Sequence, residues 1–488
     1  MGHDEESRLV LLRLSGDIGT KARPTRHQFV SRLIHNLRDA LRAEGIRPRL
    51  QIARDRLFAE LPRHADAAVL SRVFGLQSIS LVERVPASSQ EALVAVGAEL
   101  FREAVRGRRF AVRARRVGDR KRITLDPRSL ERALGAALLP AAAGVDLGNP
   151  EVVAHVELLE SDAYFFPERI PAPGGLPLGV EGRAVALLSG GFDSAVAAWH
   201  MLRRGVALDY VFCNLGGATH QLGALRVAKL LADRWSYGDR PRFHCVDFEP
   251  VARELQERTE QRFWQVLLKR LMLRAAERIA DERRSPAIVT GEAVGQVSSQ
   301  TLHNLAAISP ATSLAILRPL VGFNKEEIIA LAERIGTFEL SKVVGEYCAL
   351  VPRRPATRAT AANMERQEAR MEAAVLERCL ARTEVFDLRE LDPEKLECSE
   401  LQIERVPDGA TVIDLRSRGE YREWHWPDAL WLDFTQAVRG YPSFDRSQHY
   451  VLYCEFGLKS AHLADLMRRE GFEAFHFRGG TRALKRLR

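Results

Sequence analysis

Six residues at positions 189–194, SGGFDS, have the composition of a phosphate-binding turn. They follow a short apolar run at 184–188 and precede good helix formers at 195–202. This order predicts a buried strand, a tight turn, and a helix that Asp193 or Ser194 caps. The two glycines allow an anion to approach the backbone N–H groups, and the helix dipole favours negative charge there. The turn lacks both the Gly-Lys-Ser/Thr ending and the GxGxxG spacing of other nucleotide-binding loops.

A second candidate for chemistry is Cys454, which begins the loop CEFGLKS. It follows a predicted strand at 450–453 and precedes a predicted helix at 461–470. A thiol between a strand end and a helix N-terminus is favoured as the thiolate, which can accept sulfur and hold it as a persulfide among loop amides. Tyrosine phosphatases use a similar loop but need Cys-x5-Arg, and Ser460 stands where that arginine would be. A buried, inert cysteine is the alternative that stays open.

The composition limits the class of protein. At 488 residues the chain is long enough for three or four domains, and its formal net charge of +8 favours an anionic partner. The six cysteines form no CxxC pair, so we expect no zinc site, iron–sulfur cluster or disulfide scaffold. The charged N-terminus has no apolar signal region, and no apolar run approaches the length of a membrane helix. These features predict a cytosolic protein without a membrane partner.

The first 168 residues predict two small α+β modules. In the first, strands are expected at 8–14, 49–52 and 57–61, with a helix at 26–43. This order suggests a ferredoxin-like unit. In the second, strands are expected at 78–84, 109–115 and 152–159, with helices at 67–73, 89–106 and 129–139. Together they resemble the N-terminal ferredoxin-like and THUMP modules of RNA-modifying enzymes, which implies recognition of tRNA by shape and backbone.

Basic side chains gather in the second module. Residues 101–132 hold twelve lysines and arginines against four acidic residues. A basic β-hairpin region of this kind can neutralise phosphates, although a solvated arginine-rich face would have the same composition. On the resemblance to RNA-binding modules, the expected tRNA contacts are Lys21, Arg26, Arg109, Arg113, Arg115 and Arg116.

After a Pro- and Gly-rich stretch at 167–182, interpreted as a linker, strands alternate with helices. Strands are expected at 184–188, 207–214, 242–246 and 287–290, and helices at 195–202, 221–235, 254–281, 326–335 and 364–383. This alternation predicts a doubly wound parallel sheet with ligands at the carboxyl ends of its strands. The SGGFDS loop resembles that of the PP-loop ATP pyrophosphatases, which cleave ATP between the α and β phosphates and leave AMP on a substrate oxygen. A plain glycine-rich turn is the competing interpretation.

Three further blocks narrow the resemblance. GEAVGQVSSQTLHNL (291–305), LRPLVGFNKEEII (317–329) and EYCALVPRRPAT (346–357) resemble those of the tRNA 4-thiouridine synthases. The resemblance implies a nucleotide site lined by Leu187, Leu188, Ser189, Gly190, Gly191, Ser194, Phe212, Cys213, Lys269, Gly291 and Gln300. It implies ATP and Mg²⁺ as cofactors, with Lys325 as a second cation near the reacting phosphate. Asp193 can hold Mg²⁺ against the phosphates.

The C-terminal part follows a polar, irregular stretch at 384–406 that is interpreted as a linker. Residues 411–432 and 449–472 resemble a rhodanese domain, which implies that Cys454 carries a persulfide. The family also implies a redox-active disulfide between Cys348 and Cys454. The expected organisation is a multidomain α+β and α/β chain with a ferredoxin-like domain at 1–64, a THUMP domain at 65–168, a PP-loop ATP pyrophosphatase domain at 175–383 and a rhodanese-like domain at 406–488.

This resemblance covers nearly the whole chain and implies an ATP-dependent tRNA sulfurtransferase. Such an enzyme adenylates the uracil O4 of uridine-8 and replaces that oxygen with sulfur, directly from the persulfide or through released sulfide. The implied partners are tRNA, a cysteine desulfurase and a sulfur-carrier protein of thiamine synthesis. An amidating PP-loop enzyme of the GMP- or NAD-synthetase kind would need neither the cysteine loop nor the RNA-binding modules. A non-catalytic tRNA-binding protein would need neither SGGFDS nor Cys454.

Overall fold

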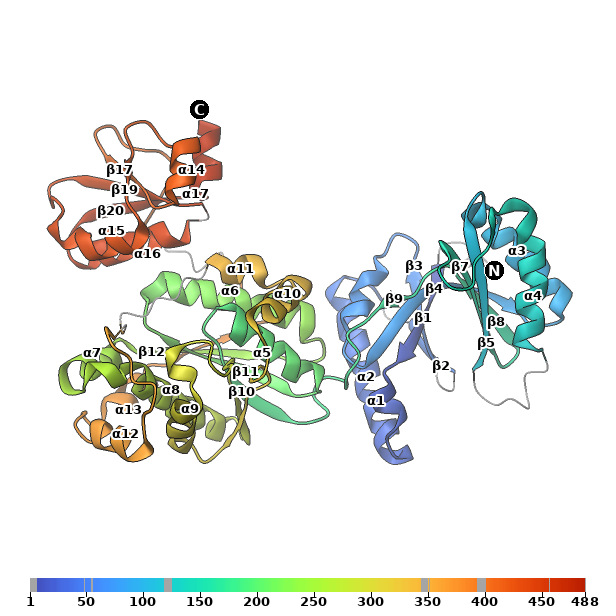
Figure 1. Ribbon diagram of the computed structural model, residues 1–488, viewed down its shortest axis with the longest axis horizontal. Helices are drawn as coiled ribbons and strands as arrows, with labels where there is room; N and C mark the ends of the chain where they lie inside the picture. Colours follow the sequence, from blue (N-terminus) through green and yellow to red (C-terminus); the bar gives the residue numbers. More distant parts are fainter. Residues whose placement is uncertain are drawn as a thin grey trace. The chain divides into compact units, whose positions relative to one another are not determined.

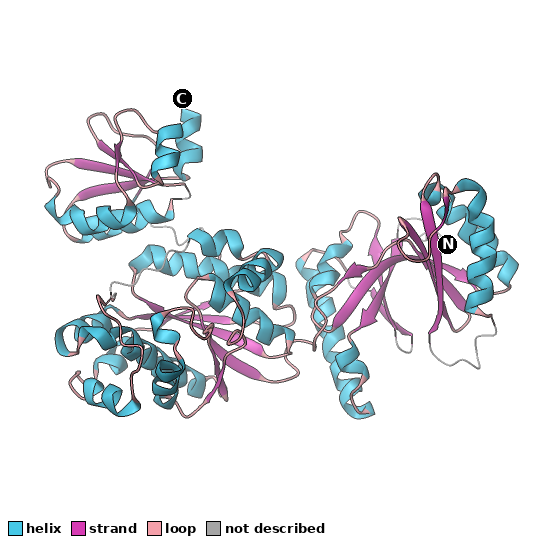
Figure 2. Ribbon diagram, in the orientation of Figure 1, coloured by secondary structure: helices cyan, strands magenta, loops and turns pink. Residues whose placement is uncertain are grey.

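The chain divides into two compact units. Figures 1 and 2 show their helices and strands. The computed structural model describes residues 7–47, 49–53, 56–117, 125–343, 350, 352–392, 401–455 and 457–487. The first unit contains the residues up to 181 with two short segments at 203–205 and 237–239, and the second unit contains the rest. Within the described ranges, no helix has the length and apolar character needed to span a membrane.

One sheet runs through the whole first unit, in the order β2-β3-β1-β4-β8-β7-β5-β6, with β9 beside β4. Its strands are β1 Ser7–Leu14, β2 Arg49–Ala53, β3 Arg56–Pro62, β4 Leu76–Pro86, β5 Arg109–Val117, β6 Gly144–Val145, β7 Val152–Leu159, β8 Asp162–Phe166 and β9 Ile170–Pro171. The long strand β4 pairs with β1 along its first half and with β8 along its second half. β4 therefore joins the ferredoxin-like part and the THUMP-like part through a continuous hydrogen-bonded sheet.

Amphipathic helices cover the sheet of the first unit. They are α1 Gly16–Gly19, α2 Arg23–Ala43, the 3-10 helix Ala67–Arg72, α3 Gln90–Val105 and α4 Pro127–Leu138. α2 buries Phe29, Leu33 and Leu37 against the strands of the ferredoxin-like part, while α3 and α4 enclose a separate core. The Ser89 and Asp126 side chains cap α3 and α4 by accepting backbone N–H groups of the first turn.

Two expectations for this unit are wrong. The basic strand β5 is not part of a hairpin, because it pairs in parallel with β7 and β6. The stretch 167–182 is not a free linker, because it contributes β9 to the sheet and buries Leu176 and Leu178. Proline and glycine reveal an irregular backbone, but only the packed chain shows that the apolar side chains between them enter a core.

The second unit contains a six-stranded sheet, counted over the described ranges, in the order β14-β13-β10-β11-β12-β15. Its strands are β10 Arg183–Leu187, β11 Ala207–Asn214, β12 Arg242–Asp247, β13 Ala287–Val289, β14 Ala315–Leu317 and β15 Glu384–Asp387. All neighbours pair in parallel except β12 and β15, which are antiparallel. The parallel sheet is as predicted, but the expectation of irregular structure throughout 384–406 is wrong, since β15 pairs with the exposed edge of β12.

Helices cover both faces of this sheet (Figure 2). They are α5 Phe192–Arg203, α6 Gly217–Trp235, α7 Glu249–Arg258, α8 Trp264–Glu282, α9 Leu302–Ile308, α10 Lys325–Ile335, α11 Phe338–Val343, α12 Ala361–Glu368 and α13 Val375–Leu380. The single helices predicted at 254–281 and 364–383 are each broken in two. The first break falls where Thr259 adopts an extended conformation and the Glu260 N–H bonds to Gln367, a partner distant in sequence.

The C-terminal part of the second unit is a parallel sheet in the order β16-β20-β19-β17-β18. Its elements are β16 Gln402–Ile403, β17 Thr411–Asp414, α14 Arg418–Glu423, β18 Leu430–Trp431, α15 Phe434–Gly440, β19 His449–Tyr453, α16 Leu458–Arg469, β20 Glu473–Phe477 and α17 Gly480–Leu484. Strand β19 lies between β17 and β20, so the residue that follows it, Cys454, stands at the middle of the sheet's carboxyl edge.

Candidate active site

The SGGFDS segment forms a closed turn between β10 and α5. Ser194 Oγ donates to the Gly191 carbonyl at 3.1 Å and accepts from the Ser189 N–H at 3.1 Å. The Ser189 and Ser194 hydroxyl oxygens also lie 3.1 Å apart. Gly190 has φ of 81°, a left-handed conformation that glycine adopts without strain. The turn therefore sets the start of α5 and two hydroxyls at the carboxyl edge of the sheet, where an anion is favoured.

A second segment, 291–300, packs against this turn. A side chain at Gly291 would place its Cβ 2.6 Å from the Asp193 carbonyl carbon and 2.7 Å from the Ser194 nitrogen. Gln296 Nε2 donates to Asp193 Oδ2 at 2.9 Å. Gln300 is buried, and its Oε1 accepts from the Ala293 N–H at 3.3 Å. The glycine permits the contact, and the two glutamines hold the segment and the Asp193 carboxylate in place.

A buried carboxylate, Glu292, connects two basic side chains in the same region. Its Oε1 lies 3.0 Å from Lys269 Nζ, and its Oε2 lies 2.8 Å from Arg318 Nε. Burial raises the pKa of Glu292, but Lys269 and Arg318 outweigh that effect and hold the pKa below its ordinary value. The carboxylate is therefore ionised, and the group of three carries a net positive charge.

Other predicted nucleotide-site residues form the floor of this region. The Leu188 N–H donates to the Val211 carbonyl at 2.9 Å, and Leu187 is half-buried at the end of β10. The Phe212 and Cys213 side chains are buried within the sheet's cores. Phe212 stacks at 5.9 Å from Phe243, and burial raises the pKa of the Cys213 thiol well above its ordinary value. Their roles toward a nucleotide stay predictions.

Lys325 is placed differently. It begins α10 behind Asn324, whose side chain and that of Glu327 form a reciprocal cap. Its side chain is exposed, and among the described residues no hydrogen bond or ion pair joins it to the turn at 189–194. The sequence-based role of Lys325 beside the reacting phosphate stays a prediction.

Cys454 lies directly after β19 and is only 4% exposed. Its Sγ is 3.6 Å from Ser460 Oγ, which donates to the Gly457 carbonyl at 2.9 Å. The Thr481 N–H donates to the Cys454 carbonyl at 3.1 Å and fixes the loop from the other side. The thiol thus stands between a strand end and the N-terminus of α16. Cys348, its expected partner, lies outside the described residues, so their pairing stays a prediction.

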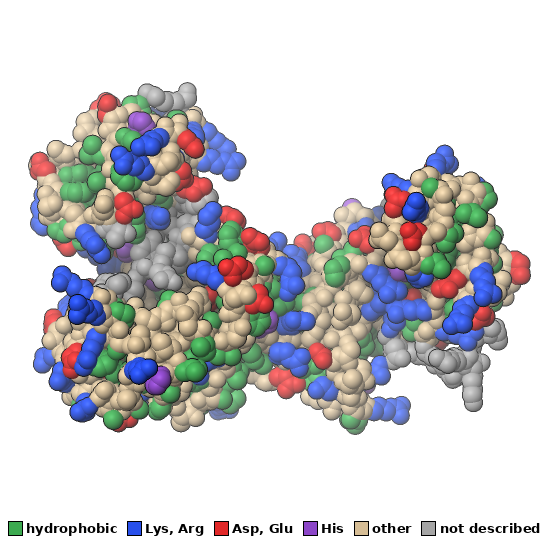
Figure 3. Space-filling view, in the orientation of Figure 1, with side chains coloured by type: hydrophobic (Ala, Val, Ile, Leu, Met, Phe, Trp, Pro, Cys, Tyr) green, Lys and Arg blue, Asp and Glu red, His purple; other side chains and the backbone are tan. Residues whose placement is uncertain are grey.

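A cluster of charged residues occupies the first unit, where Figure 3 shows basic side chains gathered over the strands. Glu157 is 1% exposed, and its carboxylate binds Arg13 at 2.7 Å, Arg56 at 3.0 Å and Arg115 at 2.6 Å. Burial raises the pKa of Glu157, but the three guanidinium groups outweigh it and lower the pKa to about 2. Because these residues come from β1, β3, β5 and β7, the cluster links the two halves of the shared sheet.

The remaining predicted tRNA contacts do not share one set of partners. Arg109 is exposed, with Nη1 3.9 Å from Asp146. Arg113 donates to the Leu147 carbonyl, whereas Arg116 donates to the Leu125 carbonyl at 2.9 Å. Lys21 is exposed with its Nζ over the Phe29 ring, and Arg26 is half-buried. Arg115 differs from all of these, because it is engaged with the buried Glu157.

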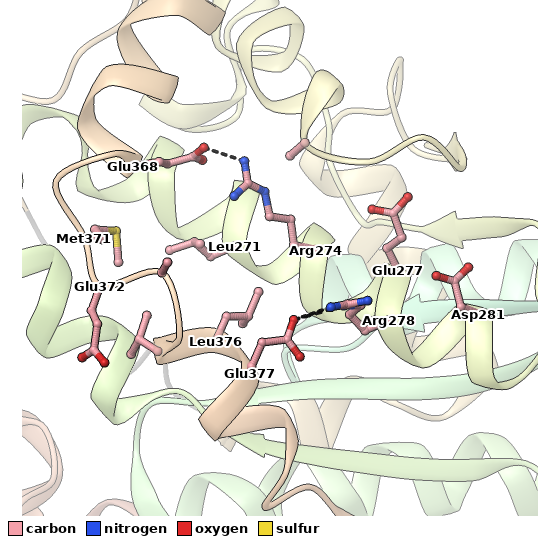
Figure 4. Close-up of a pocket in the computed structure, with 13 residues that line it drawn as sticks. Leu271, Arg274, Glu277, Arg278, Asp281, Glu368, Met371, Glu372, Leu376 and Glu377 are labelled. Carbon is pink, nitrogen blue, oxygen red and sulfur yellow. Dashed lines mark hydrogen bonds and ion pairs between the residues drawn. The ribbon is translucent and has the colours of Figure 1, made fainter.

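A cavity of about 420 Å³ lies elsewhere in the second unit, between the C-terminal half of α8 and the helices α12 and α13 (Figure 4). Ion pairs of Arg274 with Glu368 and of Arg278 with Glu377 line it. Since β13 starts soon after α8 ends, this half of α8 lies toward the amino ends of the strands. The cavity thus lies at the opposite end of the sheet from the turn at 189–194, and it adds no residue to the candidate site.

The site also contains residues that sequence reasoning missed. Glu292 and Gln296 lie in the block that supplied Gly291 and Gln300, and Arg318 lies in the block that supplied Lys325. For Glu292 and Arg318 the signal was a charged side chain just after a short apolar run, where ligand-binding residues of parallel sheets concentrate, whereas Gln296 had no such signal. The block alone did not show which of its polar side chains reach the turn.

The residues fit a magnesium ion that arrives with its phosphates. Among the described ranges no three metal-ligating side chains form a group. Asp193 supplies one carboxylate at the turn, oriented by Gln296. Mg²⁺ is usually bound by one or two carboxylates together with substrate phosphates, so one oriented carboxylate is a sufficient protein contribution.

Four family descriptions match successive parts of the chain. The ThiI ferredoxin-like domain matches residues 9–80, and the THUMP domain matches 87–166. The thiamine biosynthesis protein (ThiI) family matches 179–373, and the rhodanese-like domain matches 399–487. The predicted combination of ferredoxin-like, THUMP, PP-loop and rhodanese-like parts is confirmed.

Relatives match over nearly the whole length. A tRNA sulfurtransferase of Thermoplasma acidophilum is 36% identical over 471 residues, which are 96% of this chain and 94% of the relative. One of Desulfurococcus amylolyticus is 38% identical over 476 residues, 96% of this chain and 97% of the relative. Among solved structures, a 4-thiouridine synthetase–RNA complex with bound ATP is 30% identical with a TM-score of 0.68, covering 78% of this chain and 99% of that one.

Proposed function

This chain belongs to the tRNA sulfurtransferase family, and we propose that it uses ATP to convert a uridine of tRNA into 4-thiouridine. The observation that carries the proposal is the presence in one chain of two sites with complementary chemistry. The phosphate turn at 189–194 with its packed segment 291–300 suits ATP, and the Cys454 loop suits a persulfide. The similar 4-thiouridine synthetase was solved with RNA and ATP.

The first step is activation of the uracil at position 8. Its O4 attacks the α phosphate of ATP, the bond to the β phosphate breaks, and pyrophosphate leaves while AMP stays on O4. Asp193 would hold Mg²⁺, which would supply positive charge to neutralise the phosphates. The turn amides, the Ser189 and Ser194 hydroxyls and Lys269 hold the phosphates in place. The uracil C4 then carries AMP, a good leaving group, in place of the carbonyl oxygen, which is a poor one.

The second step uses sulfur carried by Cys454. A cysteine desulfurase transfers a sulfur atom to the Cys454 thiolate to form a persulfide. The terminal sulfur attacks C4 of the uracil, AMP leaves, and a disulfide joins the base to Cys454. The Cys348 thiolate attacks Cys454, which releases 4-thiouridine and closes a Cys348–Cys454 disulfide. A cellular dithiol supplies the two electrons that reopen this disulfide.

The first unit binds the tRNA in this proposal. Exposed basic side chains such as Arg109 and Arg113 suit phosphate contacts, and the continuous sheet gives them a common support. The rhodanese-like part, which carries the persulfide, also supplies sulfur to a carrier protein of thiamine synthesis.

One assay tests the proposal and separates its rivals. The full-length protein is incubated with ATP, cysteine, a cysteine desulfurase and a dithiol reductant, with or without bulk tRNA, and AMP release and the tRNA nucleosides are analysed. We expect tRNA-dependent AMP release and one 4-thiouridine per modified tRNA. AMP release without any thiolated nucleoside would favour an amidating enzyme, and tRNA binding without AMP release would favour a non-catalytic RNA-binding protein. The same assay without ATP is the control.

A further inference from the structure

Helix α8 presents two neighbouring basic residues, each bound to a buried carboxylate from a different segment. Lys269 binds Glu292, which follows β13, at 3.0 Å. Arg270 binds Glu368, on α12, at 2.6 Å. Successive residues of a helix point about 100° apart, so the two carboxylates lie on different sides of α8. The Arg270 pair is in the interior, with the guanidinium 1% exposed, whereas Lys269 is 25% exposed.

The Glu292 carboxylate lies beneath two basic side chains that reach the surface. It is 8% exposed, compared with 25% for Lys269 and 18% for Arg318. Its Oε2 also accepts the Thr290 hydroxyl at 3.2 Å, so both carboxylate oxygens are engaged. One negative charge thus holds two positive charges side by side. The ammonium of Lys269 carries three N–H groups and the guanidinium of Arg318 carries five, one of which donates to Ser309 Oγ at 3.0 Å. The two cations thus have more N–H groups than the carboxylate and Ser309 can accept.

This group stands beside the phosphate turn. Glu292 directly follows Gly291, whose backbone packs on Asp193 and Ser194. Arg318 follows β14, the strand next to β13 in the parallel sheet. The two cations are therefore at the carboxyl edge, where the turn and the N-terminus of α5 attract the same anion.

We propose that Glu292 is a positioning residue that orients Lys269 and Arg318 as a paired cation site for the polyphosphate of ATP, with Arg318 as a phosphate contact in addition to Lys269. The inference rests on the proposed function, since it assumes that ATP occupies the turn. Without the carboxylate, the two cations repel each other and lose their common orientation. Preorganised charges stabilise the charge that develops on leaving pyrophosphate without reorganisation during the reaction.

The main test compares Glu292→Gln with Glu368→Gln in the full-length protein. Glu368 is the matched control, because it is 9% exposed and also pairs with two basic residues, Arg270 and Arg274. Both variants lose a buried ionic partner, so both should unfold at a lower temperature. For Glu292→Gln alone, we expect weaker binding of a non-hydrolysable ATP analogue and a kcat for tRNA-dependent AMP release lowered by roughly tenfold or more. Equal activity of the two variants would overturn the proposal.

Coupling between the substitutions separates positioning from a merely structural role. Lys269→Gln and Arg318→Gln are each made in the wild type and in the Glu292→Gln background. If Glu292 acts through the two cations, each substitution weakens analogue binding much less in the Glu292→Gln background than in the wild type. Additive effects would contradict the proposal. If Glu292→Gln does not fold, the test uses Arg318→Gln alone. An affinity for the ATP analogue equal to that of the wild type in this variant would show that Arg318 does not contact the phosphates and would overturn the proposal.

The binding measurement keeps this inference distinct from the proposed function. Analogue binding needs neither tRNA nor a sulfur donor, so it reports on the cation pair even if the wild type makes no 4-thiouridine. A wild type that binds the analogue through the paired cations but thiolates no tRNA would reject the proposed function and support the inference. If the wild type thiolates tRNA but Glu292→Gln and Glu368→Gln bind the analogue equally well, the proposed function would be supported and this inference would be rejected.

Discussion

Gln296 Nε2 donates a 2.9 Å hydrogen bond to Asp193 Oδ2 across 103 positions of sequence. This bond fixes one oxygen of the carboxylate at the phosphate turn and connects the segment 291–300 to the start of α5. A carboxylate that is oriented before the substrate arrives can hold a metal–phosphate complex with little loss of conformational freedom. The bond therefore connects Asp193, which its motif singled out, with Gln296, whose position beside the turn only the fold reveals.

Removal of the Asp193 carboxylate should abolish AMP formation. Asp193→Ala removes the group that we assign to Mg²⁺, whereas the predicted tRNA contacts lie in the other unit. We therefore expect near-normal tRNA affinity in filter binding, together with AMP release at least about a hundredfold slower, as for removal of a key electrostatic interaction. Gln296→Ala should show a smaller decrease of the same kind. AMP release at the wild-type rate in Asp193→Ala would remove Asp193 from the metal site.

Gly291→Ala should disturb the phosphate turn without unfolding the protein. The added Cβ would lie within 2.8 Å of backbone atoms of Asp193 and Ser194, so the turn or the segment must move. We expect ATP-dependent activity to fall while the thermal unfolding temperature changes little. Gly322→Ala is the matched control, because its Cβ would meet nothing within 4 Å. Similar activity in both variants would show that the close approach has no functional role.

Substitutions of Cys454 and Cys348 should block different steps of the reaction. Cys454→Ala should accept no persulfide and make no 4-thiouridine. Cys348→Ser should still accept persulfide on Cys454 yet fail to turn over repeatedly, and wild type treated without reductant should yield a Cys348–Cys454 peptide by mass spectrometry. Ser460→Ala serves as a control for the loop, since it removes the hydroxyl 3.6 Å from Sγ without removing the thiol. If Cys348→Ser turned over repeatedly at the wild-type rate, another thiol would have to attack Cys454 and release the product.

Glu157 should make the stability of the first unit depend on acid pH. Its pKa falls from an ordinary value of 4.5 to about 2 in the folded protein. A lowered folded pKa stabilises the fold above pH 4.5, and this contribution is lost as pH falls toward 2. The free energy involved is on the order of 3 kcal/mol. Unfolding by denaturant, measured from pH 6 down to about 2, should show the difference between wild type and Glu157→Gln shrinking over this window; a constant difference would contradict the assignment.

The exposed arginines of β5 should contribute to tRNA affinity through charge alone. Arg109→Gln removes a side chain that is 68% exposed and only distantly paired with Asp146, so the fold should be unaffected. We expect weaker tRNA binding and a log–log salt slope that is smaller by about one, because one phosphate is no longer neutralised. Arg84→Gln is a control, since its exposed guanidinium is held by Asp162 at 2.8 Å. An unchanged salt slope in Arg109→Gln would place the RNA-binding surface elsewhere.

Local patterns predicted much of this protein. The apolar run before SGGFDS, the helix formers after it and the loop that begins at Cys454 each depend on neighbours in sequence, so the strand, the turn and the helix could be recognised directly. The combination of modules was recognised from its resemblance to known families. The break at Thr259 and the edge strand β15 were not, because each depends on a partner far along the chain: Gln367 in one case and β12 in the other.

The candidate site divides in the same way. From its motifs and its resemblance to a known family, the sequence predicted nucleotide-site roles for Asp193, Ser194, Lys269, Gly291 and Gln300, and those roles stay predictions. Only the tertiary structure connected Glu292 with Lys269 and Arg318, and Glu157 with Arg13, Arg56 and Arg115. The physical reason is that these two buried carboxylates are stabilised by cations from distant segments, and no local spacing records which segments those are.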